Sequence, residues 1–261
     1  MKVKNNLLNF KDKIIYQDTD FFAFSLDSLL LANFATIRFS DKKIMDFCTG
    51  NAPIPMFLTH RTKAHIYGME IQDSVYSLGV ESVNDNGMAD QIDLICDDVK
   101  NVYSIFDSDS FDLVLVNPPY FKVNENSFIN KNDVKSIARH EILIELEDIL
   151  SSASYLLKSG GNFAMVHRPD RFLEILTLMK KYNLEPKKIR FVYPKEGEET
   201  NILLIEGSNE INCENILNNL SLEEHYNVYE KQGLDKKEII KKIAKDRGVN
   251  KNEIYQYFIE K

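Results

Sequence analysis

The residues with the clearest potential for chemistry are Asn117-Pro118-Pro119-Tyr120, which follow the apolar run Leu113 to Val116. Neither proline can donate a hydrogen bond to a strand ladder, so a strand that reaches Val116 must end here. The Asn117 side-chain oxygen and the Pro118 carbonyl are two acceptors that can draw on the hydrogens of a planar amine and make its nitrogen a better nucleophile. Tyr120 can stack on the flat group, which contributes about 1–3 kcal/mol. The same four residues are also typical of an ordinary strand-ending turn.

A second group of candidate residues lies in a loop that begins with an acid. The segment Asp46-Phe-Cys48-Thr-Gly50-Asn51-Ala52 follows an expected strand, at the place where such folds bind a nucleotide-like cofactor. The usual pattern there is acid-x-Gly-x-Gly-x-Gly, and only the middle glycine is present. Because glycine allows tight turns and a close approach of the backbone, the two substitutions indicate a less open loop. A structural turn is an equally good interpretation of this segment alone.

Two further strand ends carry acids. Glu70 ends the second expected strand ~20 residues after the loop, where it can accept hydrogen bonds from ribose hydroxyls. Asp97 and Asp98 end the third and suit the exocyclic amine of an adenine ring. An acidic rim would repel the phosphates of NAD, and no G-x-G-x-x-G is present, whereas S-adenosylmethionine carries a positive sulfonium and no phosphate. The residues expected to bind this cofactor are Asp27, Asp46, Cys48, Gly50, Asn51, Glu70, Ile71, Asp97, Asp98, Val99 and Asn117.

Alternating strands and helices position these residues, which predicts a Rossmann-like α/β fold with a doubly wound sheet. The expected strands are 43–46, 64–70, 92–96, 113–116 and 162–166, with a closing antiparallel pair at 188–193 and 201–205. The expected helices are 53–59, 73–86, 141–157 and 169–182, and Ser159-Gly160-Gly161 is expected as a tight turn. Residues 1–40 are interpreted as a lead-in with one apolar helix, which Ser25 or Asp27 would cap. Asp27 and Ser28, at its start, could face a ligand.

The chain changes character after residue 210, so we expect two domains, 1–210 and 211–261. Asp235 and Glu238 have capping-box spacing, as do Asn250 and Glu253, with Gly248 between them as a helix stop. The second domain is therefore expected to be a small helical extension with two short helices around a turn.

Composition limits the class of protein. The formal net charge of the 261 residues is −8, and the hydrophobic fraction is 44%. No apolar run is long enough to cross a bilayer, and no signal peptide is evident, so we expect a cytoplasmic protein without a membrane partner. The three cysteines show no CxxC pairing, which argues against a zinc site and a disulfide framework. We expect a monomer without a metal.

At this point the sequence resembles class I S-adenosylmethionine-dependent methyltransferases that methylate amines. More narrowly, it resembles the bacterial tRNA(Val) adenine N6-methyltransferases, which modify adenosine 37 beside the anticodon. The resemblance covers about Phe21 to Ile205. It depends on the segments already named, on Phe24-Ser-Leu-Asp-Ser28, on Ala138-Arg-His-Glu141, on Leu157-Lys-Ser-Gly-Gly161 and on His167-Arg-Pro-Asp170.

The resemblance implies a seven-stranded class I sheet, S-adenosylmethionine as cofactor and tRNA as substrate. It implies that Asn117 and Pro118 hold the target amine, beside Pro119, while Tyr120 stacks on the adenine. Glu70 would bind the cofactor's ribose and Asp98 its adenine. Basic residues near the same edge would contact the RNA, although each is also typical of a solvated surface: Lys122, Arg139, His140, His167 and Arg168.

Three alternatives remain open. A release-factor glutamine methylase shares this core but carries a helical substrate domain before the first strand, and only about 43 residues precede it here. A DNA adenine methylase would need a sizeable recognition insertion. A degenerate methyltransferase that binds RNA without catalysis would fit the altered glycine loop, but the intact Asn-Pro-Pro-Tyr opposes it.

Overall fold

The structure is a computed structural model, and it describes residues 1–8, 10–19, 26–120, 144–210, 221–230, 234–247 and 249–258. The chain forms two compact units, Met1–Glu210 and Ile211–Lys261. Each unit is described by itself.

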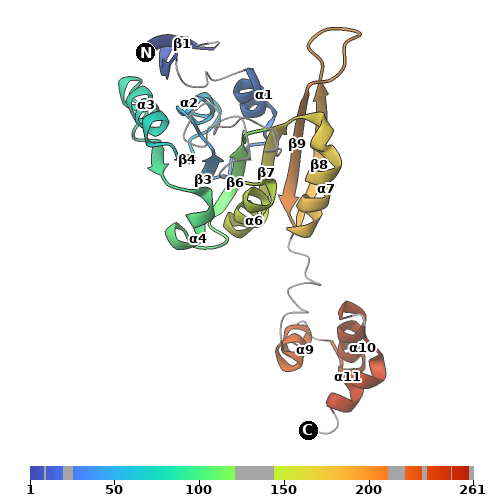
Figure 1. Cartoon of the computed structure of the whole chain (residues 1–261). Helices are drawn as coiled ribbons and strands as arrows, with labels where there is room; N and C mark the ends of the chain where they lie inside the picture. The colour runs from blue at the N-terminus through green and yellow to red at the C-terminus, as the bar shows by residue number, and fades with distance from the viewer. Residues whose placement is uncertain are drawn as a thin grey trace. The chain divides into compact units, whose positions relative to one another are not determined.

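The first unit contains a seven-stranded sheet with the strand order β5-β4-β3-β6-β7-β9-β8 (Figure 1). Neighbouring strands from β5 to β7 run parallel, while β9 is antiparallel to both β7 and β8. The expected Rossmann-like α/β sheet is therefore confirmed. The chain leaves β3 towards β4 on one side and later returns as β6 on the other, which makes the β3–β6 boundary a topological switch point. The strands are β3 (Lys43–Phe47), β4 (His65–Glu70), β5 (Ile92–Cys96), β6 (Phe111–Val116), β7 (Leu157–His167), β8 (Leu184–Val192) and β9 (Ile202–Asn209).

Helices cover both faces of this sheet (Figure 1). One face packs against α1 (Leu26–Phe34), α2 (Pro53–Leu58) and α3 (Asp73–Asp85). The other packs against α4 (Val102–Ile105), α6 (Leu146–Leu156) and α7 (Phe172–Lys181). Two short 3-10 helices, η1 (Val99–Asn101) and η2 (Pro169–Arg171), follow β5 and β7.

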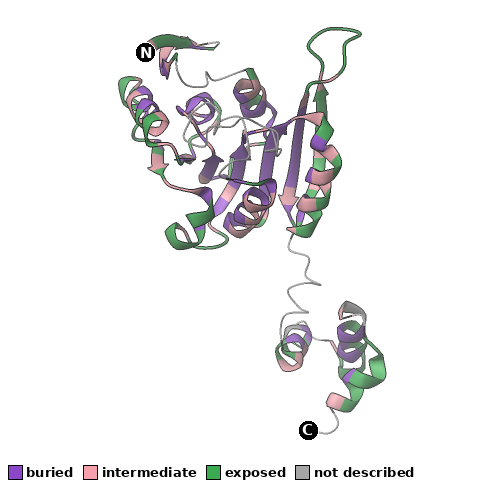
Figure 2. Ribbon diagram, viewed as in Figure 1, coloured by how far each residue is buried: buried purple, intermediate pink, exposed green. Residues whose placement is uncertain are grey.

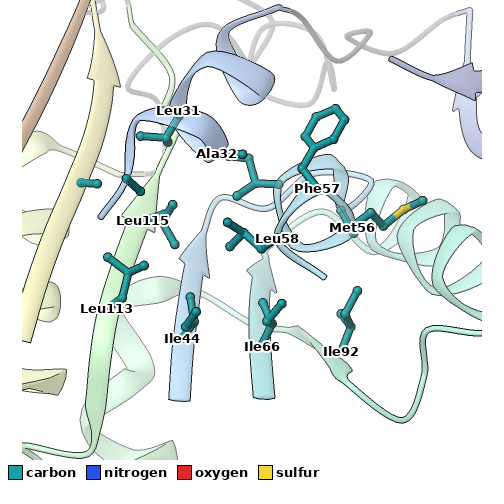
Figure 3. Packing of buried hydrophobic residues seen from close by; sticks show 14 of the residues in the cluster. Leu31, Ala32, Ile44, Met56, Phe57, Leu58, Ile66, Ile92, Leu113 and Leu115 are labelled. Carbon is teal, nitrogen blue, oxygen red and sulfur yellow. The ribbon is translucent and has the colours of Figure 1, made fainter. Parts of the chain in front are cut away.

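Two apolar cores result, because successive strand residues point to opposite faces. Ile44 and Leu113 belong to the core under α1 and α2, shown from close by in Figure 3. Met45 and Val114, one residue further along each strand, belong to the opposite core. Figure 2 shows the sheet as the buried centre of the unit.

Strand β6 is the most protected element that leads to the candidate site. Leu113, Val114, Leu115 and Val116 are each 0% exposed. The strand pairs with β3 on one side and with β7 on the other. The polar corner that follows β6 therefore starts from a fixed position in the middle of the sheet.

The N-terminal lead-in begins with a β-hairpin, which the sequence analysis did not predict. Strands β1 (Lys2–Leu7) and β2 (Phe10–Asp18) form a separate two-stranded antiparallel sheet. Two backbone N–H groups of β2 donate to side chains from outside the hairpin. Asn86 accepts from the Ile14 N–H at 3.0 Å, and Ser82 accepts from the Tyr16 N–H at 2.9 Å. These partners come from α3 and from the residue that follows it, so the sequence of β2 alone does not show them.

Two other local expectations change. Strand β7 begins at Leu157, and the glycine pair forms an irregularity in its pairing with β6 in place of a tight turn. Gly160 has a φ of +71°, a conformation that glycine adopts without strain. Helix α6 begins at Leu146, capped by a box between Glu145 and Asp148. Residues 141–143 of the expected helix lie outside the described part of the chain.

The second unit is helical and has its own apolar core. Helices α9 (Leu222–Glu230), α10 (Lys236–Asp246) and α11 (Lys251–Tyr257) are described, one more than expected. Asp235 caps α10 by accepting from the backbone of Lys237 and Glu238, and Asn250 caps α11. Gly248, the expected helix stop, is outside the described residues. The core contains Tyr229, Ile239, Ile240, Ile243, Ala244 and Ile254.

None of the helices within the described ranges has the length and hydropathy needed to cross a membrane.

Candidate active site

The carboxyl ends of five parallel strands meet at one edge of the sheet, as the sequence pattern predicted. Phe47 at the end of β3 pairs with Met69 of β4 and with Val116 of β6. Glu70 pairs with Cys96 at the end of β5. The residues that follow each strand are therefore neighbours, and Cys48 and Asn117 both leave the sheet at the switch point. This edge is where open α/β sheets bind ligands.

The corner after β6 is tied to the first turn of α1. The Asn117 amide nitrogen donates to Ser28 Oγ at 3.2 Å. The Tyr120 hydroxyl lies 2.7 Å from Asn117 Oδ1 and 2.9 Å from Asp27 Oδ2. Burial, together with the charge and hydrogen bond of Asp27, raises the pKa of Tyr120 well above its ordinary value. The phenol is therefore a neutral group with hydrogen-bond partners on both sides of the corner.

His167, at the end of β7, packs beside this corner. Its ring centroid lies 5.2 Å from that of Tyr120. Burial and the nearby charge of Arg171 lower the pKa of His167 to about 4, so the imidazole is neutral at physiological pH. Its Nδ1 accepts the Arg168 backbone N–H at 2.7 Å, which places the ring hydrogen on Nε2. Nε2 is buried and has no hydrogen-bond partner among the residues that the structure describes.

The loop after β3 has the positive φ values of a glycine-rich loop although only one of the three usual glycines is present. Cys48, Gly50 and Ala52 have φ values of 53°, 61° and 68°. These are the three positions where the usual pattern has glycine. A residue with a Cβ costs roughly 1–2 kcal/mol in this left-handed region, so the surrounding structure holds Cys48 and Ala52 in place. The loop therefore has three left-handed residues at the three positions where the usual pattern has glycine.

Asp46 is the buried centre of the acidic half of the site. Its exposed fraction is 0%, and one oxygen accepts from the Thr49 hydroxyl at 2.6 Å. The other oxygen, Oδ1, has no partner among the described residues. Burial, reinforced by the charge of Glu70, raises the pKa of Asp46 to about 8. This unpaired buried oxygen is therefore a candidate contact for a bound ligand.

Glu70 links the loop to the end of β4. One carboxylate oxygen accepts from the Gly50 N–H at 2.9 Å, and the other accepts from the Gln72 N–H at 3.0 Å. Burial raises the pKa of Glu70, against the lowering effect of these hydrogen bonds. Each oxygen retains acceptor capacity for a further hydroxyl.

Asp97 and Asp98 continue the acidic edge. Asp97 accepts from Asn101 Nδ2 at 2.7 Å, while Asp98 caps η1 and forms an ion pair of 3.3 Å with Lys100. The charges of Glu70, Asp46 and Asp98 all act on the Cys48 thiol, whose pKa is raised mainly by burial. Ile71 is 38% exposed and Val99 is 5% exposed, which gives this edge one open and one buried apolar side chain.

Two of the residues expected to bind the cofactor have hydrogen-bond partners in other elements. The Asn51 amide donates to the Tyr16 carbonyl at 2.7 Å, so its side chain holds the hairpin. Asp27 contacts Tyr120. Thr49, Gln72 and Tyr16 were missed by the sequence analysis; only Thr49, three residues after Asp46, has a spacing that pointed to its partner.

The basic residues expected to contact RNA are only partly described. Lys122, Arg139 and His140 lie outside the described residues. Arg168 is half-buried, and its Nε lies 3.4 Å from Asp170 Oδ1. His167 is 1% exposed and packs against Tyr120. Within the described ranges, no group of three or more His, Cys, Asp and Glu side chains is arranged to hold a metal ion.

Comparison with known proteins gives consistent results. The model of the family described as methyltransferase small domain matches residues 25–185. A protein of Bacteroides thetaiotaomicron named tRNA1(Val) (adenine(37)-N6)-methyltransferase is 27% identical over 204 residues, which cover 77% of this chain and 83% of the relative. A protein of Flavobacterium psychrophilum with the same name is 25% identical over 229 residues, covering 87% and 95%.

Solved structures share the fold. That of geranyl diphosphate C-methyltransferase from Streptomyces coelicolor, in complex with Mg2+, geranyl diphosphate and S-adenosyl-L-homocysteine, has a TM-score of 0.53 and 13% identity. The similarity covers 70% of this chain and 79% of that one. The sheet is thus a class I methyltransferase sheet.

Proposed function

The chain belongs to the methyltransferase small domain family, and on that premise we propose that it methylates the exocyclic N6 amine of an adenine in tRNA. The observation that carries this proposal is the corner after β6. There the Asn117 carboxamide and the ring of Tyr120 are held together beside the acid-lined loop after β3. The names of the relatives support adenine in tRNA as the target.

The methyl donor is S-adenosyl-L-methionine, which supplies an electrophilic methyl group when bound. The residues present fit this group. The orphaned Oδ1 of Asp46 offers an acceptor, and the acidic edge suits a cation without phosphates. Glu70 accepts ribose hydroxyls with its remaining lone pairs, and Asp98 accepts from the adenine amine. Other residues complete this set through side chain or backbone: Cys48, Gly50, Ile71, Asp97, Val99 and Asn117.

The chain's own part in the reaction is to position the amine. Asn117 Oδ1 and the Pro118 carbonyl accept its two hydrogens, which reduces the delocalisation of the nitrogen lone pair. Pro118 and the buried Pro119 stiffen the corner, and Tyr120 stacks on the base. The amine gains a methyl group and releases a proton to solvent after transfer, so no strong base is required. The neutral imidazole of His167, beside the Tyr120 ring, forms one side of the pocket that receives the base.

Within tRNA, the target that we propose is adenosine 37 of tRNA(Val), because the relatives are named for that nucleoside. A base in a folded anticodon loop must leave its stack to reach this corner, at a cost of a few kcal/mol. Arg168, and the expected Lys122, Arg139 and His140, supply cationic contacts to the RNA backbone near the pocket.

The two units have different roles in this proposal. Residues 1–210 carry methyl transfer, and residues 211–261 form an accessory helical unit. Helix α10 exposes Lys236, Lys237, Lys241 and Lys242, so this unit contributes to the affinity for RNA.

The test is transfer of a labelled methyl group to an unmodified tRNA(Val) transcript. Wild-type protein labels this transcript, and an adenosine-to-guanosine change at position 37 abolishes the labelling. Labelled release factor together with unlabelled tRNA would instead identify a glutamine methylase. Donor binding without transfer to either substrate would identify an RNA-binding protein without catalysis.

A further inference from the structure

Four side chains from two distant parts of the chain form a continuous hydrogen-bonded chain at the candidate site. Ser28 and Asp27 come from the first turn of α1, and Asn117 and Tyr120 follow β6. Asn117 Nδ2 donates to Ser28 Oγ at 3.2 Å, and the Tyr120 hydroxyl lies within hydrogen-bond distance of both Asn117 Oδ1 and Asp27 Oδ2. Ser28 is 3% exposed, so this contact is shielded from water.

The Tyr120 hydroxyl has one hydrogen and faces two acceptors. The raised pKa of Tyr120 means that the hydroxyl keeps this hydrogen at physiological pH. It can be given to the Asn117 oxygen at 2.7 Å or to the Asp27 carboxylate at 2.9 Å, but not fully to both. When it points to Asn117, it takes up one of the two lone pairs of the oxygen that the target amine needs and so weakens the hydrogen bond that the amine can donate there.

We propose that Asp27 is a positioning residue that takes the Tyr120 hydroxyl hydrogen and so leaves the Asn117 oxygen to the target amine. This inference deepens the proposed function and rests on it. A carboxylate accepts a hydrogen bond about twice as strongly as a neutral group does, so Asp27 competes well with Asn117 for this hydrogen. The change from one acceptor to the other breaks no covalent bond and transfers no proton, because the Tyr120 hydroxyl only rotates about its C–O bond.

Ser28 has the complementary role. By accepting from the Asn117 nitrogen, it fixes which end of the carboxamide faces Tyr120 and the pocket. A rotation of the amide by 180° would place its nitrogen there, and a nitrogen donor cannot accept a hydrogen from the amine. The first turn of α1 thus orients both polar groups of the corner.

The inference predicts a specific dependence between two substitutions. Asp27→Ala removes one of the two described acceptors of the Tyr120 hydroxyl and leaves the other, Asn117, so kcat for tRNA methylation falls about tenfold. Asp27→Asn keeps an acceptor oxygen and recovers part of this loss. In a Tyr120→Phe background the competing hydroxyl is gone, so adding Asp27→Ala lowers kcat by less than twofold. The KM for the methyl donor stays within twofold in all of these variants.

The matched control is a second carboxylate–tyrosine pair on the other face of the sheet. The Tyr182 hydroxyl donates to Glu147 Oε1 at 2.7 Å, and Glu147 also lies in the first turn of a helix. Glu147→Gln and Tyr182→Phe, alone and combined, leave kcat unchanged. Thermal melts of every variant show whether a loss of activity comes from a loss of folded protein.

The outcomes separate the inference from the function on which it rests. If wild-type protein does not methylate tRNA, the proposed function is wrong. If wild-type is active but the effects of Asp27→Ala and Tyr120→Phe multiply, the inference is wrong. A rise of tenfold or more in the donor KM of Asp27→Ala, with unchanged kcat, would instead show that Asp27 binds the cofactor.

Discussion

The backbone N–H of Gly50 donates to Glu70 Oε2 over 2.9 Å, which ties the loop after β3 to the end of β4. The same carboxylate accepts the Gln72 N–H with its other oxygen. Glu70 is therefore a brace for the loop as well as a candidate ligand for the donor's ribose. The Glu70 carboxylate thus both holds the loop after β3 in its conformation and offers acceptor oxygens for the donor.

We expect Glu70→Gln to weaken donor binding about tenfold or more. The amide replaces one acceptor oxygen with a donor, so either a loop contact or a ribose contact is lost, and a hydrogen bond to a charged group contributes about 1.5–3 kcal/mol. Titration calorimetry with S-adenosyl-L-methionine measures the change. The KM for tRNA should stay within twofold; a rise in that KM with unchanged donor affinity would remove Glu70 from the donor site.

Gly68 in β4 leaves space for the loop side chains. A Cβ added there would lie 2.7 Å from Leu94 Cδ2 and 2.8 Å from Thr49 Oγ1. Gly68→Ala should lower the free energy of unfolding by about 1–3 kcal/mol and weaken donor binding, because Thr49 must move away from Asp46. The control is Gly197→Ala, where a Cβ meets nothing within 4 Å and only its φ of +82° is strained. Equal donor affinity in Gly68→Ala and wild type would refute the link to Thr49.

The pKa of Asp46 predicts a dependence of stability on pH. This pKa is raised to about 8 in the folded protein, so between about pH 4 and pH 8 the folded state binds a proton that the unfolded state has released. The stabilising effect of that proton is fully present below about pH 4 and is lost as the pH rises through about 8. The free energy of unfolding of the donor-free protein should therefore fall across this window.

Asp46→Asn isolates this effect, since an amide of the same shape does not titrate. We expect the difference in melting temperature between pH 6 and pH 8 to be smaller in Asp46→Asn than in wild type. Parallel profiles for the two proteins would show that Asp46 is already ionised when buried.

Removal of the second unit should spare the chemistry. Each unit has its own apolar core, so a chain that ends at Glu210 should fold and bind the donor as the full chain does. Loss of the exposed lysines of α10 should raise the KM for tRNA and make its salt dependence less steep, with kcat little changed. An unchanged KM and salt slope would show that the second unit does not contact RNA.

The sequence predicted the parts of the site that depend on short-range patterns. The apolar run before Asn117 and the two prolines after it identify a strand and its end. Glu70 was placed correctly at the end of the second parallel strand because strand length and position are readable from hydrophobic periodicity. The seven-stranded sheet follows from the same alternation of strands and helices.

Other features depend on contacts between distant segments and could not be read from the sequence. The positive φ of Cys48 and Ala52 is imposed by the surrounding structure, against the preference of both residues. The hairpin strand β2 takes its edge hydrogen bonds from Ser82 and Asn86, about 70 residues away. Asp27 had been expected to bind the cofactor, and only the fold places it against Tyr120.

The central claim is that the corner at Asn117 directs a methyl group to the N6 amine of adenine. Its most direct test is nucleoside analysis by mass spectrometry of tRNA(Val) after reaction with wild-type protein and with Asn117→Ala. The account predicts N6-methyladenosine with wild type and at least a hundredfold less with Asn117→Ala. Methylation at a different atom, or an undiminished rate in Asn117→Ala, would contradict it.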